Sequence, residues 1–255
     1  TSLPTKIKKM DNLIPTPIKF DEWKTPMHIM VILAHPDDPE FFLGGTIAQW
    51  TASGHEVSYL LLTRGDKGIS EQFPDGEQLK KVREKEQKEA AAVVGVTQID
   101  FLDHADGYLE VNLANRKQVT AEIRRQKPDI VVSCDPQMLF FDAYINHPDH
   151  RAAGQLAIDA VFPAAGNREY FPELLEAGLE PVDIKEVWLS LTKEPNIILD
   201  VSEHWETRLK ALKKHVSQIG DPVLFEEKWS ERRKNSTGDE THYYEQFRRI
   251  VLRHS

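Results

Sequence analysis

The sequence is nearly free of cysteine, because Cys134 is the single one among 255 residues. A lone cysteine excludes an intrachain disulfide and every metal site that needs several thiolates, such as a multi-cysteine zinc site or an iron–sulfur cluster. A metal bound by this chain would therefore need His, Asp or Glu ligands. The lack of cysteine pairs also suits a reducing compartment such as the cytosol.

Long apolar runs and an excess of positive charge are missing too. No apolar run approaches the ~20 residues that span a bilayer, and residues 1–26, which carry four prolines, have no continuous apolar core of the signal-peptide kind. The formal net charge is −9, which argues against a broad basic face for nucleic acid. These absences predict a cytoplasmic protein with no membrane span and no nucleic-acid partner.

What the chain does contain is the composition of an ordinary globular protein, with 40% hydrophobic and 29% charged residues. This excludes disorder and leaves enough apolar residues for a sizeable core. No internal repeat, low-complexity tract or linker interrupts the sequence after residue 26. We therefore expect an irregular lead-in over 1–26 and a single domain over 27–255.

Strands and helices are predicted to alternate along that domain. The run HIMVILAH, which begins at His28, is apolar without alternation, as is typical of a parallel strand covered on both faces. The expected strands are 28–35, 55–63, 98–102, 129–134, 186–191 and 196–201; the expected helices are 41–51, 78–94, 115–126, 148–161, 204–218 and 243–252, with a solvated connection over 226–240. This order favours a three-layer, Rossmann-like α/β fold with a mostly parallel sheet, in which ligands bind beyond the carboxyl ends of the strands.

A cluster of ionisable residues follows the first predicted strand, where this fold class binds its ligands. It consists of His35, Asp37, Asp38 and Glu40. Burying such groups is costly unless they are paired or bind something. Capping of the next helix would by itself account for Asp37 or Asp38 taken singly, since Asp is a favoured N-cap. The presence of His35 beside them favours a functional site.

A second cluster, His147, Asp149 and His150, follows the fourth predicted strand, and Pro148 suits the first turn of the next helix. Taken alone, it could be a solvated pair of surface histidines. In a parallel sheet, however, both strand-to-helix corners open at the same edge, so the two clusters can converge in space. Together they contain the imidazole and carboxylate ligands of a zinc hydrolase that keeps one position open for water.

The residue types suggest roles, although spacing alone does not decide between the two aspartates. His35, His150 and one aspartate would form a His2Asp ligand set, and the other aspartate would be free to deprotonate a bound water. His147 precedes His150 by one helical turn, where its imidazole could stabilise an oxyanion or protonate a leaving amine. Iron, cobalt or nickel could occupy the same ligands as zinc.

The motif AHPDDPE, followed far downstream by HPDH, resembles the PIG-L/LmbE family of zinc-dependent de-N-acetylases, which remove acetyl groups from N-acetylglucosaminyl and related substrates. The resemblance runs from about residue 28 to residue 252. Weaker landmarks follow in order: LLLTRGDKG at 60–68, Arg83 with Glu86, the pair Asp106–Gly107, and Ser217–Gln218 preceded by His215. One departure is Pro39, which stands before Glu40 where relatives often read Asp-Asp-Glu.

The resemblance implies a role for each matching position. It implies zinc ligation by His35, Asp38 and His150, with Asp37 as general base and His147 as the electrostatic or acid partner. It also implies substrate-facing roles for Arg83 and Asp106, although Arg83 lies in a charged helical segment where pairing with Glu86 or Gln87 is routine. Asp149 would orient His147 from outside the ligand set, or cap the helix.

The expected activity is therefore hydrolysis of the N-acetyl group of an N-acetylglucosamine-type sugar or conjugate, by zinc-activated water with Asp37 as the base. The expected partner is this small molecule, and a homo-oligomer is compatible with the sequence. The alternatives are an amidase for another N-acyl substrate, such as a thiol conjugate or antibiotic precursor, and a non-catalytic sugar-binding relative. A dinucleotide-binding enzyme is not supported, because HPDDPEFFLGG lacks the G-x-G-x-x-G pattern.

Overall fold

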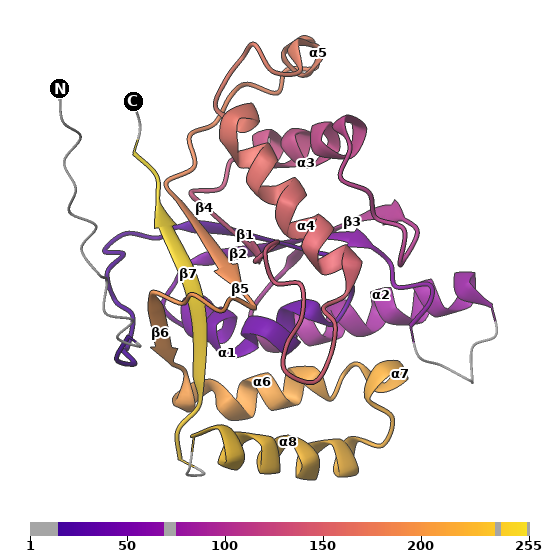
Figure 1. The fold of residues 1–255 in the computed structure, drawn as a ribbon, viewed down its shortest axis with the longest axis vertical. Helices are drawn as coiled ribbons and strands as arrows, with labels where there is room; N and C mark the ends of the chain where they lie inside the picture. Colours follow the sequence, from indigo (N-terminus) through magenta and orange to yellow (C-terminus); the bar gives the residue numbers. More distant parts are fainter. Residues whose placement is uncertain (1–14, 69–74, 238–240, 254–255) are drawn as a thin grey trace, which may run out of the picture.

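The structure, a computed structural model, describes residues 15–68, 75–237 and 241–253. Within this part of the chain, the centre of the fold is a seven-stranded sheet with the order β3-β2-β1-β4-β5-β7-β6 (Figure 1). Its strands are β1 (His28–Leu33), β2 (Glu56–Thr63), β3 (Gln98–His104), β4 (Ile130–Cys134), β5 (Glu186–Ser190), β6 (Ile197–Asp200) and β7 (Tyr244–Val251). The first five strands in that order pair in parallel, whereas β7 runs antiparallel to both of its neighbours.

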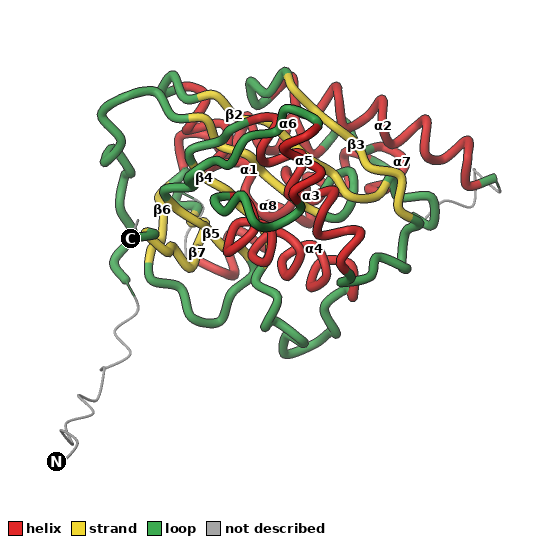
Figure 2. The backbone as a smooth tube through the Cα atoms, turned by 90° about the horizontal axis from the view of Figure 1, so that it is seen from above, coloured by secondary structure: helices red, strands yellow, loops and turns green. Residues whose placement is uncertain are grey.

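Helices cover both faces of the sheet, as Figures 1 and 2 show. One face carries α3 (Leu113–Gln126) and α4 (Pro148–Asp159), and the other carries α1 (Asp38–Ala52), α2 (Gly76–Val93) and α6 (Trp205–Leu212). The shorter elements are a π-helical segment (Ala160–Ala165), α5 (Pro172–Glu176), a 3₁₀ turn (Ser202–His204) and α7 (Val216–Ile219), and α8 (Pro222–Thr237) packs outside α6. The predicted three-layer architecture is confirmed.

Strand β1 is apolar from Ile29 to Leu33 because it is covered on both faces. Ile29, Val31 and Leu33 face the core shared with α1, α2 and α6, while Met30 and Ile32 face the core shared with α3 and α4. All five side chains are fully buried. The first polar residue after these five is His35, which lies beyond the carboxyl end of the strand.

The order of the strands brings two strand-to-helix corners together. Strand β1 lies between β2 and β4, and the chain passes from β1 into α1 on one face and from β4 towards α4 on the other. Such a switch point opens a crevice beyond the carboxyl ends of the strands, where doubly wound folds bind their ligands. Both histidine-containing clusters are located at this edge.

The described part of the predicted lead-in packs against the sheet. Ile18 forms a parallel bridge with Leu199, and the rings of Phe20 and Trp23 lie 5.3 and 5.7 Å from that of Trp188. Residues 1–14 lie outside the described part of the chain. The division into a lead-in and one domain stays a prediction.

The helix predicted over 243–252 is wrong, because these residues form β7. Glu245 and Phe247 are buried while the residues next to them are exposed, which is the two-residue period of a strand. Glu245 is charged, yet its carboxylate accepts from the backbone N–H groups of Gly45 (3.0 Å) and Thr46 (2.8 Å). A buried charged side chain therefore concealed the alternating pattern.

The segment from 204 to 240 also departs from expectation. The single helix expected over 204–218 is interrupted at 213–215, where His215 adopts a non-helical backbone conformation. The solvated connection expected over 226–240 is mostly α8, which packs the rings of Phe225 and Trp229 against Phe41; residues 238–240 lie outside the described part. Contacts with α1, distant in sequence, therefore stabilise a helix that its charged composition did not indicate.

No helix in the described part of the chain combines the length and apolarity needed to cross a membrane. The expectation of a cytoplasmic protein stays a prediction.

Candidate metal centre and active site

Three predicted ligand residues converge at the switch point. His35 Nδ1 lies 3.3 Å from His150 Nε2, and the two oxygens of Asp38 lie 3.5 Å from His35 Nδ1 and 3.1 Å from His150 Nε2. Ligand atoms about 2.0–2.1 Å from one tetrahedral metal ion are separated by roughly 3.4 Å. The three side chains are therefore close enough to share a single ion, and Asp38 is the aspartate that contacts both histidines.

The carboxylate of Asp38 is held in its ionised form. Burial raises the pKa of Asp38, but the imidazoles of His150 and His35 outweigh this effect and hold that pKa well below its usual range. The backbone N–H of His35 also donates to Asp38 Oδ2 at 2.8 Å. A charged, oriented carboxylate is the form that a metal requires.

Two further carboxylates orient His35 from the opposite side of its ring. His35 Nε2 lies 3.2 Å from Asp106 Oδ1 and 3.3 Å from Asp149 Oδ2. Asp149 in turn accepts from the backbone N–H groups of Gly107 and Leu109. A carboxylate behind a histidine fixes the tautomer in which the other nitrogen, here Nδ1, is free for a metal.

This arrangement changes the expected roles of both carboxylates. Asp149 was expected to orient His147 or cap α4, but its side chain contacts His35. Asp106 was expected to face the substrate, and it also contacts His35 and accepts from Lys67 N at 3.2 Å. Burial raises the pKa of Asp106, yet its hydrogen bond to His35 and the charge of that ring prevail and lower it to about 2. A substrate contact by Asp106 stays a prediction.

Asp37 lies at the N-cap position of α1, but its side chain forms no capping hydrogen bond. Its Oδ2 lies 3.3 Å from Arg83 Nη2. Burial raises the pKa of Asp37; the Arg83 charge opposes this shift, and the neighbouring charge of Asp38 adds to it. A carboxylate that is not needed as a cap and whose pKa is raised suits a general base.

Arg83 is buried behind Asp37 and is held by the backbone. Its guanidinium donates to Pro36 O at 2.6 Å and to Gly65 O at 3.0 Å, in addition to contacting Asp37. A Cβ at Gly65 would come within 2.2 Å of Arg83 Nη1, so the turn at residue 65 needs glycine. These contacts make Arg83 a support for Asp37, and the expected substrate contact by Arg83 stays a prediction.

His147 closes the other side of the centre. Its ring lies 4.7 Å from that of His35 and 5.3 Å from that of His150, and its Nδ1 accepts from Asp149 N at 3.2 Å. Burial lowers the pKa of His147, and the His35 and His150 rings lower it further. A neutral imidazole whose Nδ1 accepts a hydrogen bond carries its proton on Nε2, where it can be donated.

A ring nitrogen of His147 also belongs to a second set of ligand atoms. His35, His147 and His150 each place one ring nitrogen within 4.8 Å of the others. The placement of His147 outside the ligand set stays a prediction.

Sequence reasoning did not predict the hydrogen bonds that join several buried residues behind Asp37. Gln87 Oε1 accepts from Asp37 N at 2.7 Å, and Gln87 Nε2 donates to Glu40, which also contacts Tyr59 and His215. The available signal was the spacing of Arg83 and Gln87, which places both on one face of α2. The partners of Gln87 lie too far away in sequence for spacing to reveal them.

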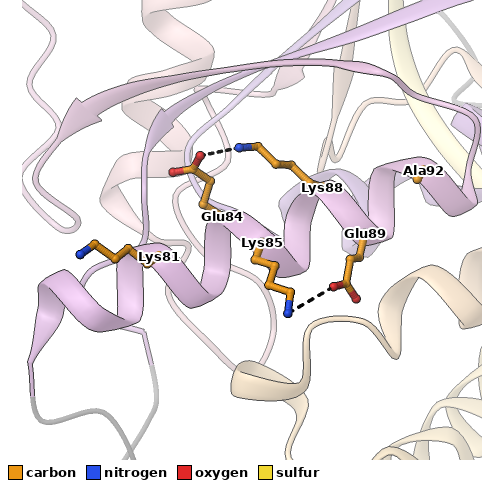
Figure 3. A pocket seen from close by; sticks show the side chains of 6 residues that line it. All are labelled: Lys81, Glu84, Lys85, Lys88, Glu89 and Ala92. Carbon is orange, nitrogen blue, oxygen red and sulfur yellow. Dashed lines mark hydrogen bonds and ion pairs between the residues drawn. The ribbon is translucent and has the colours of Figure 1, made fainter.

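A hollow on the outer side of α2 does not belong to this site (Figure 3). It is lined by Lys81, Glu84, Lys85, Lys88, Glu89 and Ala92. The charged side chains pair with each other, Lys88 with Glu84 at 2.6 Å and Lys85 with Glu89 at 3.9 Å. None of its lining residues belongs to either cluster.

The chain is similar to several known deacetylases. Diacetylchitobiose deacetylase of Thermococcus kodakarensis is 38% identical over 217 residues, covering 85% of this chain and 78% of the relative. A probable N-acetyl-alpha-D-glucosaminyl L-malate deacetylase 2 of Bacillus anthracis is 28% identical over 206 residues, covering 78% and 85%. The structure of N,N'-diacetylchitobiose deacetylase from Pyrococcus horikoshii with its inhibitor MPG is 32% identical, with a TM-score of 0.79, and covers 88% of this chain and 84% of that one.

The family model described as PIG-L, GlcNAc-PI de-N-acetylase, matches residues 30–161. The matched segment contains both clusters, His35 to Glu40 and His147 to His150, together with Arg83 and Asp106. With the geometry of the centre and the similarity over most of its length, the chain belongs to the PIG-L family of de-N-acetylases.

Proposed function

We propose that this protein is a zinc-dependent N-deacetylase that hydrolyses the acetamide of an N-acetylglucosamine-type sugar or conjugate. The observation that carries the proposal is the convergence of His35, Asp38 and His150, whose nitrogen and oxygen atoms approach one another to 3.1–3.5 Å, beside a separately held carboxylate, Asp37. His35, Asp38 and His150 would hold the metal. The named activities of the relatives support the choice of substrate.

Zinc bound at this centre would polarise the amide carbonyl and lower the pKa of a water molecule. Asp37 accepts the proton of the attacking water, because burial makes its carboxylate more basic and Arg83 holds it in place. His147 donates from Nε2 to the negatively charged oxygen that develops on the acetyl carbon. Asp37 then returns its proton to the departing amine, so that acetate and a free amino sugar leave.

The test is a measurement of acetate and of newly formed amine. The protein is supplied with N-acetylglucosamine, diacetylchitobiose and an N-acetylglucosaminyl conjugate, after loading with zinc or, in parallel, with iron, cobalt or nickel. We expect equal amounts of acetate and amine from at least one sugar, no release after chelation, and recovery on adding metal. A metal-loaded protein that releases acetate from none of them would contradict the proposal.

The alternatives predict other outcomes in the same test. An amidase for a thiol conjugate or an antibiotic precursor would leave the three sugars intact but hydrolyse its own N-acyl substrate. A non-catalytic relative would bind an N-acetylated sugar without releasing acetate. The complete set of ligands, base and His147 in the described residues counts against the non-catalytic alternative.

Asp106→Asn is expected to weaken zinc binding about 10- to 100-fold, because it removes one carboxylate that orients His35. Competition with a zinc chelator measures this affinity. Asp103→Asn is the matched control, since Asp103 lies on β3, three residues before Asp106, and pairs with Arg64 and Lys80 instead of His35. An unchanged affinity in Asp106→Asn, or an equal loss in the control, would show that Asp106 does not support the metal.

A further inference from the structure

Asp37 has an unusual backbone conformation. Its φ is +92° and its ψ is −30°, in a region that residues with a side chain rarely adopt. Its carbonyl accepts from Glu40 N and Phe41 N and so begins α1. A conformation of this kind persists only where surrounding contacts enforce it.

The positive φ of Asp37 is enforced by two side chains on one face of α2. Both of them bind the same peptide unit. The peptide between Pro36 and Asp37 has two polar groups, the carbonyl of Pro36 and the N–H of Asp37. Arg83 donates to that carbonyl at 2.6 Å, and Gln87, one helical turn later, accepts from that N–H at 2.7 Å. Both ends of the peptide dipole are thus fixed, and with them the plane that sets φ of Asp37.

Gln87 can form this bond only in one orientation of its amide, and Glu40 determines that orientation. Gln87 Nε2 lies 3.1 and 3.0 Å from the two oxygens of Glu40, and both side chains are fully buried. A carboxylate only accepts hydrogen bonds, so the amide must present its NH2 group to Glu40 and its oxygen to Asp37. Tyr59 Oη and His215 Nε2, each 3.1 Å away, hold Glu40 itself.

We propose that Gln87 is a positioning residue for Asp37: it locks the Pro36–Asp37 peptide so that the Asp37 carboxylate is aimed at the water beside the metal centre. Gln87 acts through Asp37 and is itself sealed from substrate. This inference rests on the proposed function, in which Asp37 is the general base.

The test is Gln87→Met, which has a similar length and volume but lacks the amide. We expect kcat to fall at least tenfold, KM to stay within about twofold, and zinc content to equal that of the wild type, because the proposed ligands are unchanged and Gln87 is fully buried. Gln126→Met is the matched control, since Gln126 also accepts (from Ser58, 2.7 Å) and donates (to Asp100, 3.0 Å) but lies on α3. Its kcat should be unchanged.

A charge swap separates positioning from general loss of packing. Gln87→Glu keeps the acceptor for Asp37 N but places two carboxylates together, so kcat should fall. Adding Glu40→Gln restores an amide facing a carboxylate, and the double variant should recover most of the lost kcat. A double variant no better than Gln87→Glu would contradict the proposed orientation.

A readout without substrate keeps the inference separate from the proposed function. Exchange of the Asp37 amide hydrogen with solvent, measured by NMR, should be slow in the wild type and in Gln126→Met, and faster in Gln87→Met. If the wild type deacetylates no sugar, the proposed function fails. The exchange measurement still tests whether Gln87 holds the Pro36–Asp37 peptide. Unchanged Asp37 exchange, or an active protein whose Gln87→Met variant keeps its kcat, would overturn the inference.

Discussion

Replacing Asp37 with Asn is expected to lower kcat by about 10²- to 10⁴-fold, the usual contribution of a general base, and to leave zinc content near one per chain. The amide has the shape of the carboxylate and can still accept from Arg83, but it cannot take a proton from water. Asn also tolerates the left-handed backbone at φ +92° better than most residues. The loss therefore reports the missing base and not a disturbed turn.

Zinc content measured together with kcat separates the two roles open to this residue. Retained zinc with lost activity agrees with the assignment of Asp37 as base. Loss of zinc along with activity would instead show that Asp37 is a ligand, and Asp38 would then become the candidate base. Circular dichroism of the variant confirms that the fold is intact.

His150→Ala is expected to abolish both stoichiometric zinc and acetate release. The substitution removes the nitrogen that lies 3.1 Å from Asp38 and 3.3 Å from His35, and two protein ligands do not make a stable zinc site. It also removes one of the two imidazoles that contact the Asp38 carboxylate. Metal analysis after dialysis, followed by the acetate assay with added zinc, measures both effects.

His55→Ala is the matched control, because His55 accepts from Met27 N at the amino ends of β1 and β2, whereas the metal centre lies beyond the carboxyl ends of the strands. It should keep its zinc and its kcat. His147→Ala should also keep zinc while losing activity. If His150→Ala kept a full equivalent of zinc and His147→Ala lost it, the ligand set would have to be reassigned to include His147.

The parts of the fold that the sequence predicts are those whose burial is uniform along the element. Strand β1 is apolar from Ile29 to Leu33 because both faces are covered, and the sequence IMVIL shows this directly. In β7, by contrast, the buried positions include Glu245, whose charge is compensated by backbone N–H groups of α1. The pattern of residues within a strand does not show that its charged residue is bound by a helix two hundred positions away in the sequence.

In the candidate site too, the sequence predicts local features better than contacts between residues distant in sequence. The two motifs predict which residues converge, because the topology brings two strand ends to one edge. They do not predict that Asp149 contacts His35 or that Arg83 holds the Pro36 carbonyl, and their spacing leaves open which aspartate faces the histidines, which only the family resemblance indicated. Those features depend on the turn at Asp37 and on side chains from α2, which are set only when the elements pack.

The two hydrogen bonds that Glu245 accepts from the middle of α1 have a consequence for truncating this protein. All the proposed metal and catalytic residues lie between His35 and His150, inside the segment that matches the family model. Yet the N–H groups of Gly45 and Thr46, on the helix that begins with Asp38, are satisfied by a strand added two hundred residues later. A fragment limited to residues 30–161 would contain all the proposed metal and catalytic residues but would leave these two N–H groups of α1 without their acceptor. We therefore expect the smallest active unit to extend through β7.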